Sequence, residues 1–224
     1  MPLNPHVILQ SFDKWAIDFF GPINPLGKKT GAGYIITATD YMKRWAKAQQ
    51  VKDCNIDTTV KFIVEYILSR FVCLKLFISD QAPHFLNKTI EKITEEFQVH
   101  HQKCIPYHPK VNRTVEAFNK ILENTLTKVC NVNRNDWDLR IPLVLWAYRM
   151  TCKKLIGQTP FRLVYGQEEI MPMEYIVLSL RILAFTNMED YDIMKERMAQ
   201  LLALEEDKFI VGFHQQVQKA SEKA

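Results

Sequence analysis

Apolar and polar residues follow two different periods along the chain, and these periods separate its expected strands from its expected helices. A period of two, or a short run of β-branched residues, predicts strands over 14–20, 33–39 and 45–51. The short connections between these three strands favour an antiparallel meander. Shorter apolar runs predict two more strands, over 74–78 and 98–102.

Apolar residues that recur every three or four positions predict helices between and after these strands. The expected helices cover residues 57–71, 86–97, 113–131, 136–150 and 159–165. Asp57 or Thr58 is the expected N-cap of the first of them. Three strands followed by helix, strand, helix, strand and further helices indicate an α/β fold with a mixed sheet.

The last part of the chain predicts a long helix that is interrupted or frayed near Gly212. Its apolar residues fall on one side and are typical of packing or of a partner surface. They are Met194, Met198, Leu201, Leu202, Phe209 and Phe213. We therefore divide the chain into a domain of residues 1–186 and a helical tail of residues 187–224.

Composition indicates a globular protein, since 47% of the 224 residues are hydrophobic and 24% are charged. No apolar run approaches the roughly 20 residues that a spanning helix needs, and the N-terminus lacks the basic-then-apolar order of a secretory signal. We therefore expect an intracellular protein without a membrane partner. The net charge is +4, and acidic residues are in excess in the tail, so the body is basic and compatible with a polyanionic partner.

Cysteine spacing argues against a disulfide framework and against a zinc ribbon. The five cysteines occur singly, without a Cys-x-x-Cys pair, and small buried apolar residues are the favoured interpretation. They are Cys54, Cys73, Cys104, Cys130 and Cys152. His100 and His101 lie near Cys104, but this spacing does not supply the four ligands of a structural zinc site.

Three acidic residues stand out by their settings. Asp18 is the only charge in the run 15–20, Asp80 closes an apolar strand, and Glu116 lies in the first turns of a helix. Taken singly, each is typical of a strand end, a turn or a helix start. Together they could converge at one edge of the sheet, where mutual repulsion would be relieved by protonation or by divalent cations. Two such cations would support phosphoryl transfer, although spacing alone does not establish the geometry.

Five sequence blocks resemble a known family when they are taken in order. They read WAIDFFGPI, YIITATDYMKRWAKA, FISDQAPHF, PYHPKVNRTVEAFNK and LWAYRMTCKKLIGQTPFRLVYG. They are similar to the integrase core of gypsy-type long-terminal-repeat retrotransposons, especially plant elements. The resemblance runs from about Pro2 to Gly166 and continues more weakly into LLALEEDKF in the tail. The 35 residues between Asp80 and Glu116 match the spacing of retroviral-type integrases.

The resemblance implies an RNase H-like fold with a five-stranded sheet and a metal-dependent DNA-joining enzyme. The family's three catalytic, metal-binding residues fall on Asp18, Asp80 and Glu116, normally with two Mg²⁺ or Mn²⁺ ions. Family members trim the 3′ ends of element DNA and then join these ends to target DNA. The resemblance therefore implies element ends and target DNA as partners, a nuclear location and a homo-oligomer, and no small-molecule substrate.

The same resemblance suggests residues that contact DNA around the third carboxylate. Asn119 and Lys120 lie three and four residues after Glu116, hence on the same helical face. We expect them, together with Asn112 before the helix, to meet the DNA backbone, while a solvated polar face is an equally good interpretation. His108 falls in the family's Pro-Tyr-His-Pro block and is expected to shape the loop.

Two positions depart from the family pattern. Where the family has Ser-Asp-x-Gly, this chain has Ala82, followed by Pro83. If that position requires a positive φ, Ala82 is strained. Where the family has Asn-Gly before the catalytic helix, this chain has Arg113, which adds charge and bulk. Either change could displace a carboxylate and slow the reaction by orders of magnitude.

Two other functions remain open from the sequence. The family's upstream zinc domain and basic C-terminal module have no counterpart in these 224 residues, so the core alone could bind metal and still fail at complete integration. The first alternative is therefore a catalytically decayed or host-adopted, retroelement-derived DNA-binding or interaction protein. The second is a ribonuclease H-type nuclease, for which no additional acidic motif is found.

Overall fold

The computed structural model describes residues 10–71, 74–103, 113–171, 173 and 190–221. The chain forms two compact units, Met1–Tyr148 and Arg149–Ala224. The predicted domain boundary between residues 186 and 187 lies outside the described residues and stays a prediction. In the described part of the chain, no helix is both long enough and apolar enough to cross a membrane.

The first unit is built on a mixed five-stranded sheet, as the sequence predicts. Its strands are β1 (Lys14–Phe20), β2 (Tyr34–Asp40), β3 (Ala46–Val51), β4 (Leu76–Ser79) and β5 (His100–Lys103). The spatial order is β3-β2-β1-β4-β5. The first three strands form the predicted antiparallel meander, whereas β4 runs parallel to β1 and β5 runs parallel to β4.

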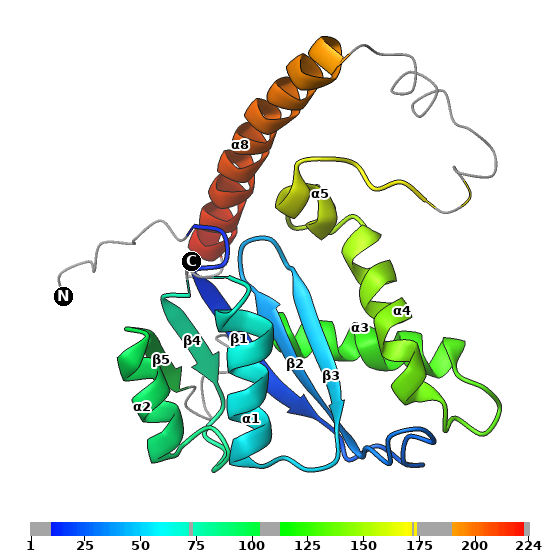
Figure 1. Ribbon diagram of the computed structural model, residues 1–224. Coiled ribbons are helices and arrows are strands. Elements are labelled where there is room, and N and C mark those ends of the chain that lie inside the picture. Colours follow the sequence, from blue (N-terminus) through cyan, green and yellow to red (C-terminus); the bar gives the residue numbers. More distant parts are fainter. Residues whose placement is uncertain (1–9, 72–73, 104–112, 172, 174–189, 222–224) are drawn as a thin grey trace. The chain divides into compact units, whose positions relative to one another are not determined.

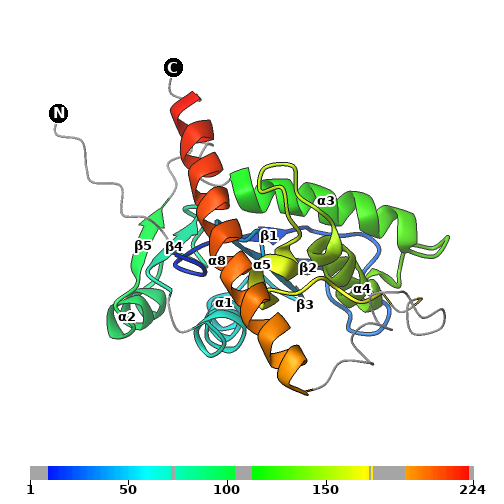
Figure 2. The same cartoon turned by 90° about the horizontal axis from the view of Figure 1, so that it is seen from above.

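Helices cover both faces of this sheet (Figures 1 and 2). One face carries α1 (Ile56–Phe62), which continues as the π-helix η1 (Ile63–Leu68), and α2 (Lys88–Glu96). The other carries α3 (Arg113–Val129), beside which α4 (Trp137–Met150) packs. Within the first unit, the predicted helix positions are confirmed to within a few residues at their ends.

The N-cap of α1 differs from the prediction. Asn55 has an extended backbone and its side chain accepts a hydrogen bond from the Thr58 amide at 2.8 Å. The predicted caps, Asp57 and Thr58, lie inside the helix. The prediction was wrong because three polar residues compete for the helix start, and the cap is the one whose backbone is still extended.

The larger core joins α3 and α4 to the β2–β3 side of the sheet. Phe118 and Leu122 of α3 and Ile141 of α4 are almost completely buried against Ile35. A smaller cluster lies where α3 crosses β1 and β4. Because β-strand side chains alternate between faces, each strand gives every second residue to this α3-covered face.

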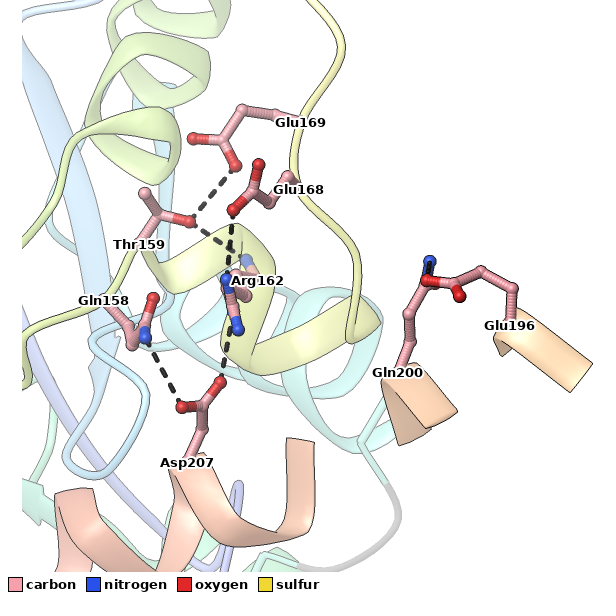
Figure 3. A network of polar contacts seen from close by, with 8 residues as sticks. All are labelled: Gln158, Thr159, Arg162, Glu168, Glu169, Glu196, Gln200 and Asp207. Carbon is pink, nitrogen blue, oxygen red and sulfur yellow. Dashed lines mark hydrogen bonds and ion pairs between the residues drawn. The ribbon is translucent and has the colours of Figure 1, made fainter. Parts of the chain in front are cut away.

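The second unit contains α5 (Pro160–Tyr165), which the sequence predicts, and the tail helix α8 (Asp190–Ser221). Thr159 caps α5 by accepting from the Arg162 amide at 3.1 Å. The Arg162 guanidinium contacts Glu168 at 3.0 Å and Asp207 of α8 at 3.1 Å (Figure 3). A pocket of about 430 Å³ lies between α8 and a wall formed by Arg162 and residues 166–170. The ion pair of Arg162 with Asp207 connects α5 to the tail helix.

The tail helix corrects two predictions. It runs through Gly212 without interruption, because a single glycine costs a helix only about 1 kcal/mol relative to alanine. The six apolar residues from Met194 to Phe213, for which packing or a partner surface was predicted, are all exposed, so packing within the described part of the chain is excluded and the partner surface stays a prediction. Leu204 is buried instead, beside Gly166. Helical periodicity identified an apolar side but not the side that faces α5.

The described cysteines are free, as their spacing predicts. Cys54 and Cys130 are half-buried, and Cys152 is exposed. The expectation of buried thiols is therefore wrong for Cys152. Cys73 and Cys104 lie outside the described residues.

Candidate active site

Strand register brings Asp18 and Asp80 to the same level of the sheet. In the parallel pairing of β1 with β4, Ala16 lies opposite Ile78. Two residues further along lie Asp18, within β1, and Asp80, directly after the end of β4, and the alternation of side chains favours the same face for both. Ala16 and Ile78 pack against Val115 of α3. Glu116 is the next residue of α3, and its charge acts on Asp18.

The titration of Asp18 depends on its burial and on the neighbouring acidic residues. Burial raises the pKa of Asp18 to about 7, and the neighbouring charge of Asp80 is the next largest cause of the increase. Glu116 raises this pKa as well. Hydrogen bonds from the Phe19 amide and the Asn119 side chain lower it and offset part of the effect. Asp80 and Glu116 thus both lie within electrostatic reach of Asp18.

Asp18 is held by hydrogen bonds at both of its carboxylate oxygens. Its Oδ1 accepts from the Phe19 amide at 2.9 Å, and its Oδ2 accepts from Asn119 Nδ2 at 3.0 Å. Asn119 Oδ1 in turn accepts from Thr37 Oγ1 at 2.8 Å. Sequence reasoning missed Thr37, although a threonine in the middle of a largely apolar, buried strand is a signal that could have found it.

Asp80 begins a turn that contains the first departure from the family pattern. Its Oδ1 accepts from the Ala82 amide at 3.1 Å, and the Ala82 carbonyl accepts from the Phe85 amide at 2.9 Å. Ala82 does not have a positive φ, so the strain expected for alanine at this position is not present. The turn forms with the local hydrogen bond that aspartate commonly provides.

His84 is a second residue near Asp80 that sequence reasoning did not single out. Its ring lies edge-on to Phe19, with 4.5 Å between the ring centroids. Burial lowers the pKa of His84, whereas the charge of Asp80 raises it. The block FISDQAPHF contains this histidine, but the sequence alone does not show that it faces the site.

Strand β5 supports the residue before Asp80. Ser79 Oγ donates to the Asp80 carbonyl oxygen at 2.9 Å and lies 2.9 Å from His101 Nε2. This arrangement assigns the ring proton to Nε2, which then donates to Ser79. Burial lowers the pKa of His101 to about 4, so the ring is neutral at physiological pH. His101 thus contacts Ser79, the last residue of β4. Cys104, which was considered with His101 as a zinc ligand, lies outside the described residues.

The predicted DNA-contact residues occupy different environments. Lys120 is exposed on α3, one turn after Glu116. Asn119 is only 7% exposed, and its amide is engaged with Asp18 and Thr37. Arg113 is the first residue of α3, whereas Asn112 lies outside the described residues, as does His108. The predicted DNA contacts stay predictions.

The donor chemistry of the three carboxylates fits a hard divalent cation. Mg²⁺ and Mn²⁺ prefer carboxylate oxygen, and cations would relieve the repulsion that raises the pKa of Asp18. Among the residues that the structure describes, no group of three or more His, Cys, Asp or Glu side chains is arranged to hold a metal ion. Asp18, Asp80 and Glu116 are therefore candidate ligands that approach one another without forming a closed cluster.

Solved structures share this architecture. A simian T-cell lymphotropic virus intasome matches 72% of this chain and 59% of its own chain, with a TM-score of 0.60 and 17% sequence identity. The catalytic core domain of BIV integrase matches 68% of this chain and 93% of its own, with a TM-score of 0.51 and 19% identity. The mixed sheet with its flanking helices is therefore the RNase H-like fold of retroviral integrase catalytic cores.

Sequence comparison points to the same class of protein. Residues 9–109, which include Asp18 and Asp80 but not Glu116, match the family model of the integrase core domain. The Gag-Pol polyprotein of feline leukemia virus is 29% identical over 153 residues, which are 68% of this chain and 9% of the polyprotein. The Pol polyprotein from transposon 412 of Drosophila melanogaster is 20% identical over 181 residues, which are 81% of this chain and 14% of that polyprotein. The chain thus spans about a tenth of the length of these curated relatives.

Proposed function

We propose that this chain is an integrase-type polynucleotidyl transferase from a gypsy-type retrotransposon, which trims DNA 3′ ends and joins them to target DNA. The observation that carries the proposal is the register of β1 with β4, which brings Asp18 and Asp80 to one level beneath the start of α3. The charge of Glu116 at Asp18 supports the third member of the site. The integrase core match over residues 9–109 supports the same class of enzyme.

Each carboxylate has a distinct role in the proposed chemistry. Asp18 would be the central ligand, because the Phe19 amide and Asn119 fix the orientation of its carboxylate. Asp80 would face it from the residue after β4, and Glu116 would complete the set from α3. Two Mg²⁺ or Mn²⁺ ions, when bound, would supply the Lewis acidity that phosphoryl transfer requires. The protein itself would orient the ligands and hold the DNA backbone beside them.

DNA would lie along the exposed side of α3. Lys120 is exposed one helical turn from Glu116, where a cation can contact a phosphate while the reacting group lies at the carboxylates. A positive net charge on the chain favours the approach of a polyanion. A DNA-joining role further implies a nuclear location and assembly with other copies of the chain, so that two element ends can be joined to one target DNA.

A strand-joining assay tests the proposal. The purified chain is incubated with Mn²⁺ and a labelled duplex that has a recessed 3′ end, beside an Asp80→Asn variant. We expect products longer than the donor strand with the wild type and none with the variant, because Asn lacks the charge that a divalent cation requires. Asp57→Asn is the matched control, since Asp57 is exposed in the first turn of α1, and it should join DNA like the wild type.

The outcome also separates the enzyme from its main alternative. A folded wild-type chain that binds the duplex but forms no joined products would contradict the enzymatic proposal. It would favour a retroelement-derived DNA-binding protein that keeps the fold. Equal joining by Asp80→Asn and the wild type would remove Asp80 from the mechanism.

A further inference from the structure

Three polar side chains form a hydrogen-bonded chain that begins inside the protein and ends at the candidate site. Thr37 of β2 donates to Asn119 Oδ1 at 2.8 Å, and Asn119 Nδ2 donates to Asp18 Oδ2 at 3.0 Å. Thr37 is completely buried, and Asn119 is 7% exposed. These three side chains can form the two hydrogen bonds because Thr37 lies opposite Asp18 in the pairing of β1 with β2, on the face that α3 covers.

The hydrogen bonds of Asn119 with Thr37 and with Asp18 both require the same orientation of the Asn119 amide. Thr37 places a hydroxyl donor against the amide oxygen, and Asp18 places an acceptor oxygen against the amide nitrogen. Rotating the amide by half a turn would place its oxygen against the carboxylate, where two acceptors repel. Without the Thr37 hydroxyl, the Asn119 oxygen would be buried without that donor, and the amide would lose the contact that fixes its inner end.

The orientation of Asn119 determines how Asp18 presents its oxygens. Oδ1 already accepts from the Phe19 amide at 2.9 Å, and Oδ2 accepts from Asn119. A carboxylate with one donor at each oxygen cannot rotate freely, and each oxygen keeps a lone pair for a cation. Hydrogen-bonding partners behind metal ligands commonly tune affinity in this way.

Helix packing does not by itself require the Thr37–Asn119 pair. Val115, Phe118 and Leu122 of α3 are completely or almost completely buried against the sheet and hold the helix there. Thr39 lies on the same strand and face as Thr37 and serves as a comparison for a buried threonine without a role in the site. It is also completely buried, and among the described residues its hydroxyl has no hydrogen-bond partner.

We propose that Thr37 is a positioning residue that orients the Asn119 amide and, through it, sets the Asp18 carboxylate for binding a divalent cation. The inference rests on the proposed function, since it assigns Asp18 the role of metal ligand. Thr37 itself touches neither DNA nor cation. The Thr37 hydroxyl also lies 3.2 Å from the Asp18 carbonyl oxygen, a second and longer hydrogen-bond contact. The conservative variant Thr37→Ser, which keeps the hydroxyl, should preserve the effect on the Asn119 amide.

The test compares Thr37→Val, Thr37→Ser and the matched control Thr39→Val. Mn²⁺ affinity is measured by calorimetry, and the side-chain NH₂ signal of Asn119 is followed by ¹⁵N NMR in the metal-free protein. We expect Thr37→Val to weaken Mn²⁺ binding by about 10-fold or more, in the range found for partners of metal ligands. It should also shift the Asn119 NH₂ signal. Thr37→Ser should restore both, and Thr39→Val should leave both unchanged.

The two readouts distinguish the failure of this inference from the failure of the proposed function. Wild-type Mn²⁺ affinity in Thr37→Val would overturn the positioning role, and so would an equal loss in Thr39→Val, which would indicate altered strand packing. If the wild type neither binds Mn²⁺ nor joins DNA, the proposed function falls. In that case the Asn119 signal still decides whether Thr37 orients the amide, and an unchanged signal in Thr37→Val would refute it.

Discussion

Removing the charge of Asp18 should stabilise the metal-free protein at alkaline pH. The pKa of Asp18 rises from 3.8 to about 7 on folding, mainly through burial and then through the charge of Asp80. A rise of about 3 units corresponds to ~4 kcal/mol when the carboxylate is ionised. Asn at this position carries no charge but can accept only one of the two hydrogen bonds, and that loss costs about 1–3 kcal/mol. Asp18→Asn should therefore be more stable than the wild type by about 1–3 kcal/mol at pH 8.

The pH dependence gives the sign of this effect. Because the folded-state pKa is the higher one, the stability associated with protonated Asp18 is complete below pH 4 and is lost as the pH rises towards 7. At pH 5 only about 2 kcal/mol has been lost, which the missing hydrogen bond in Asp18→Asn offsets. The advantage of the variant should therefore be near zero at pH 5 and largest at pH 8. Burial also raises the pKa of Asp40 to about 7, but Asp40 is present in both proteins and cancels in the difference.

Urea unfolding in EDTA, followed by tryptophan fluorescence at pH 5 and pH 8, measures this difference. Mn²⁺ at 100 times its dissociation constant should then stabilise the wild type by about 2.7 kcal/mol and leave Asp18→Asn almost unchanged. A difference in unfolding free energy between the two proteins that is the same at both pH values would refute the electrostatic reasoning. Equal stabilisation of both proteins by Mn²⁺ would remove Asp18 as a ligand.

Two further predictions concern α3 and the second unit. Binding of duplex DNA is measured by fluorescence anisotropy at several salt concentrations, and the logarithm of the binding constant is plotted against the logarithm of the salt concentration. Lys120→Ala should lower the magnitude of the slope by about 0.9, because one phosphate contact is lost. Lys92→Ala, an exposed lysine on α2, should not change the slope. An unchanged slope in Lys120→Ala would exclude a phosphate contact by this residue. Asp207→Asn should lower the free energy of unfolding of the second unit by about 1 kcal/mol, because it removes the charge that pairs with the partly exposed Arg162 guanidinium. If the thermal unfolding temperature does not change, that ion pair does not hold α5 to α8.

The fold could be predicted from the sequence because its strands have clear periods. Residues 14–20 combine apolar side chains with a single acid, and the structure forms β1 over the same residues. The level at which Asp18 meets Asp80 could not be predicted, because it depends on the parallel pairing of β1 with a strand about sixty positions later in the chain. Local pattern determines which residues form a strand, whereas long-range packing determines which partner faces them.

Helix ends and the tail were predicted less well, for local reasons. Asn55, Asp57 and Thr58 are all good capping residues, and only the backbone angles of Asn55 select it as the N-cap. Gly212 is a common helix terminator, but one glycine cannot end a helix that is otherwise built from good helix formers. In both cases the sequence offers several solutions that differ by about 1 kcal/mol, and the rest of the chain decides between them.

The buried position of Asn119 on α3 could have been predicted from the sequence. It lies four residues after Val115 and three before Leu122, and so on the stripe of α3 that packs against the sheet. A polar side chain on a buried stripe almost always has a hydrogen-bond partner inside the protein. That rule predicts an internal partner for Asn119 more directly than it predicts contact with DNA. The partner could be sought among polar residues on buried strand faces, where Thr37 is the cross-strand neighbour of Asp18. A polar residue on a buried helical stripe, taken together with one on the facing strand, is therefore better evidence of a hydrogen bond inside the site than either residue alone.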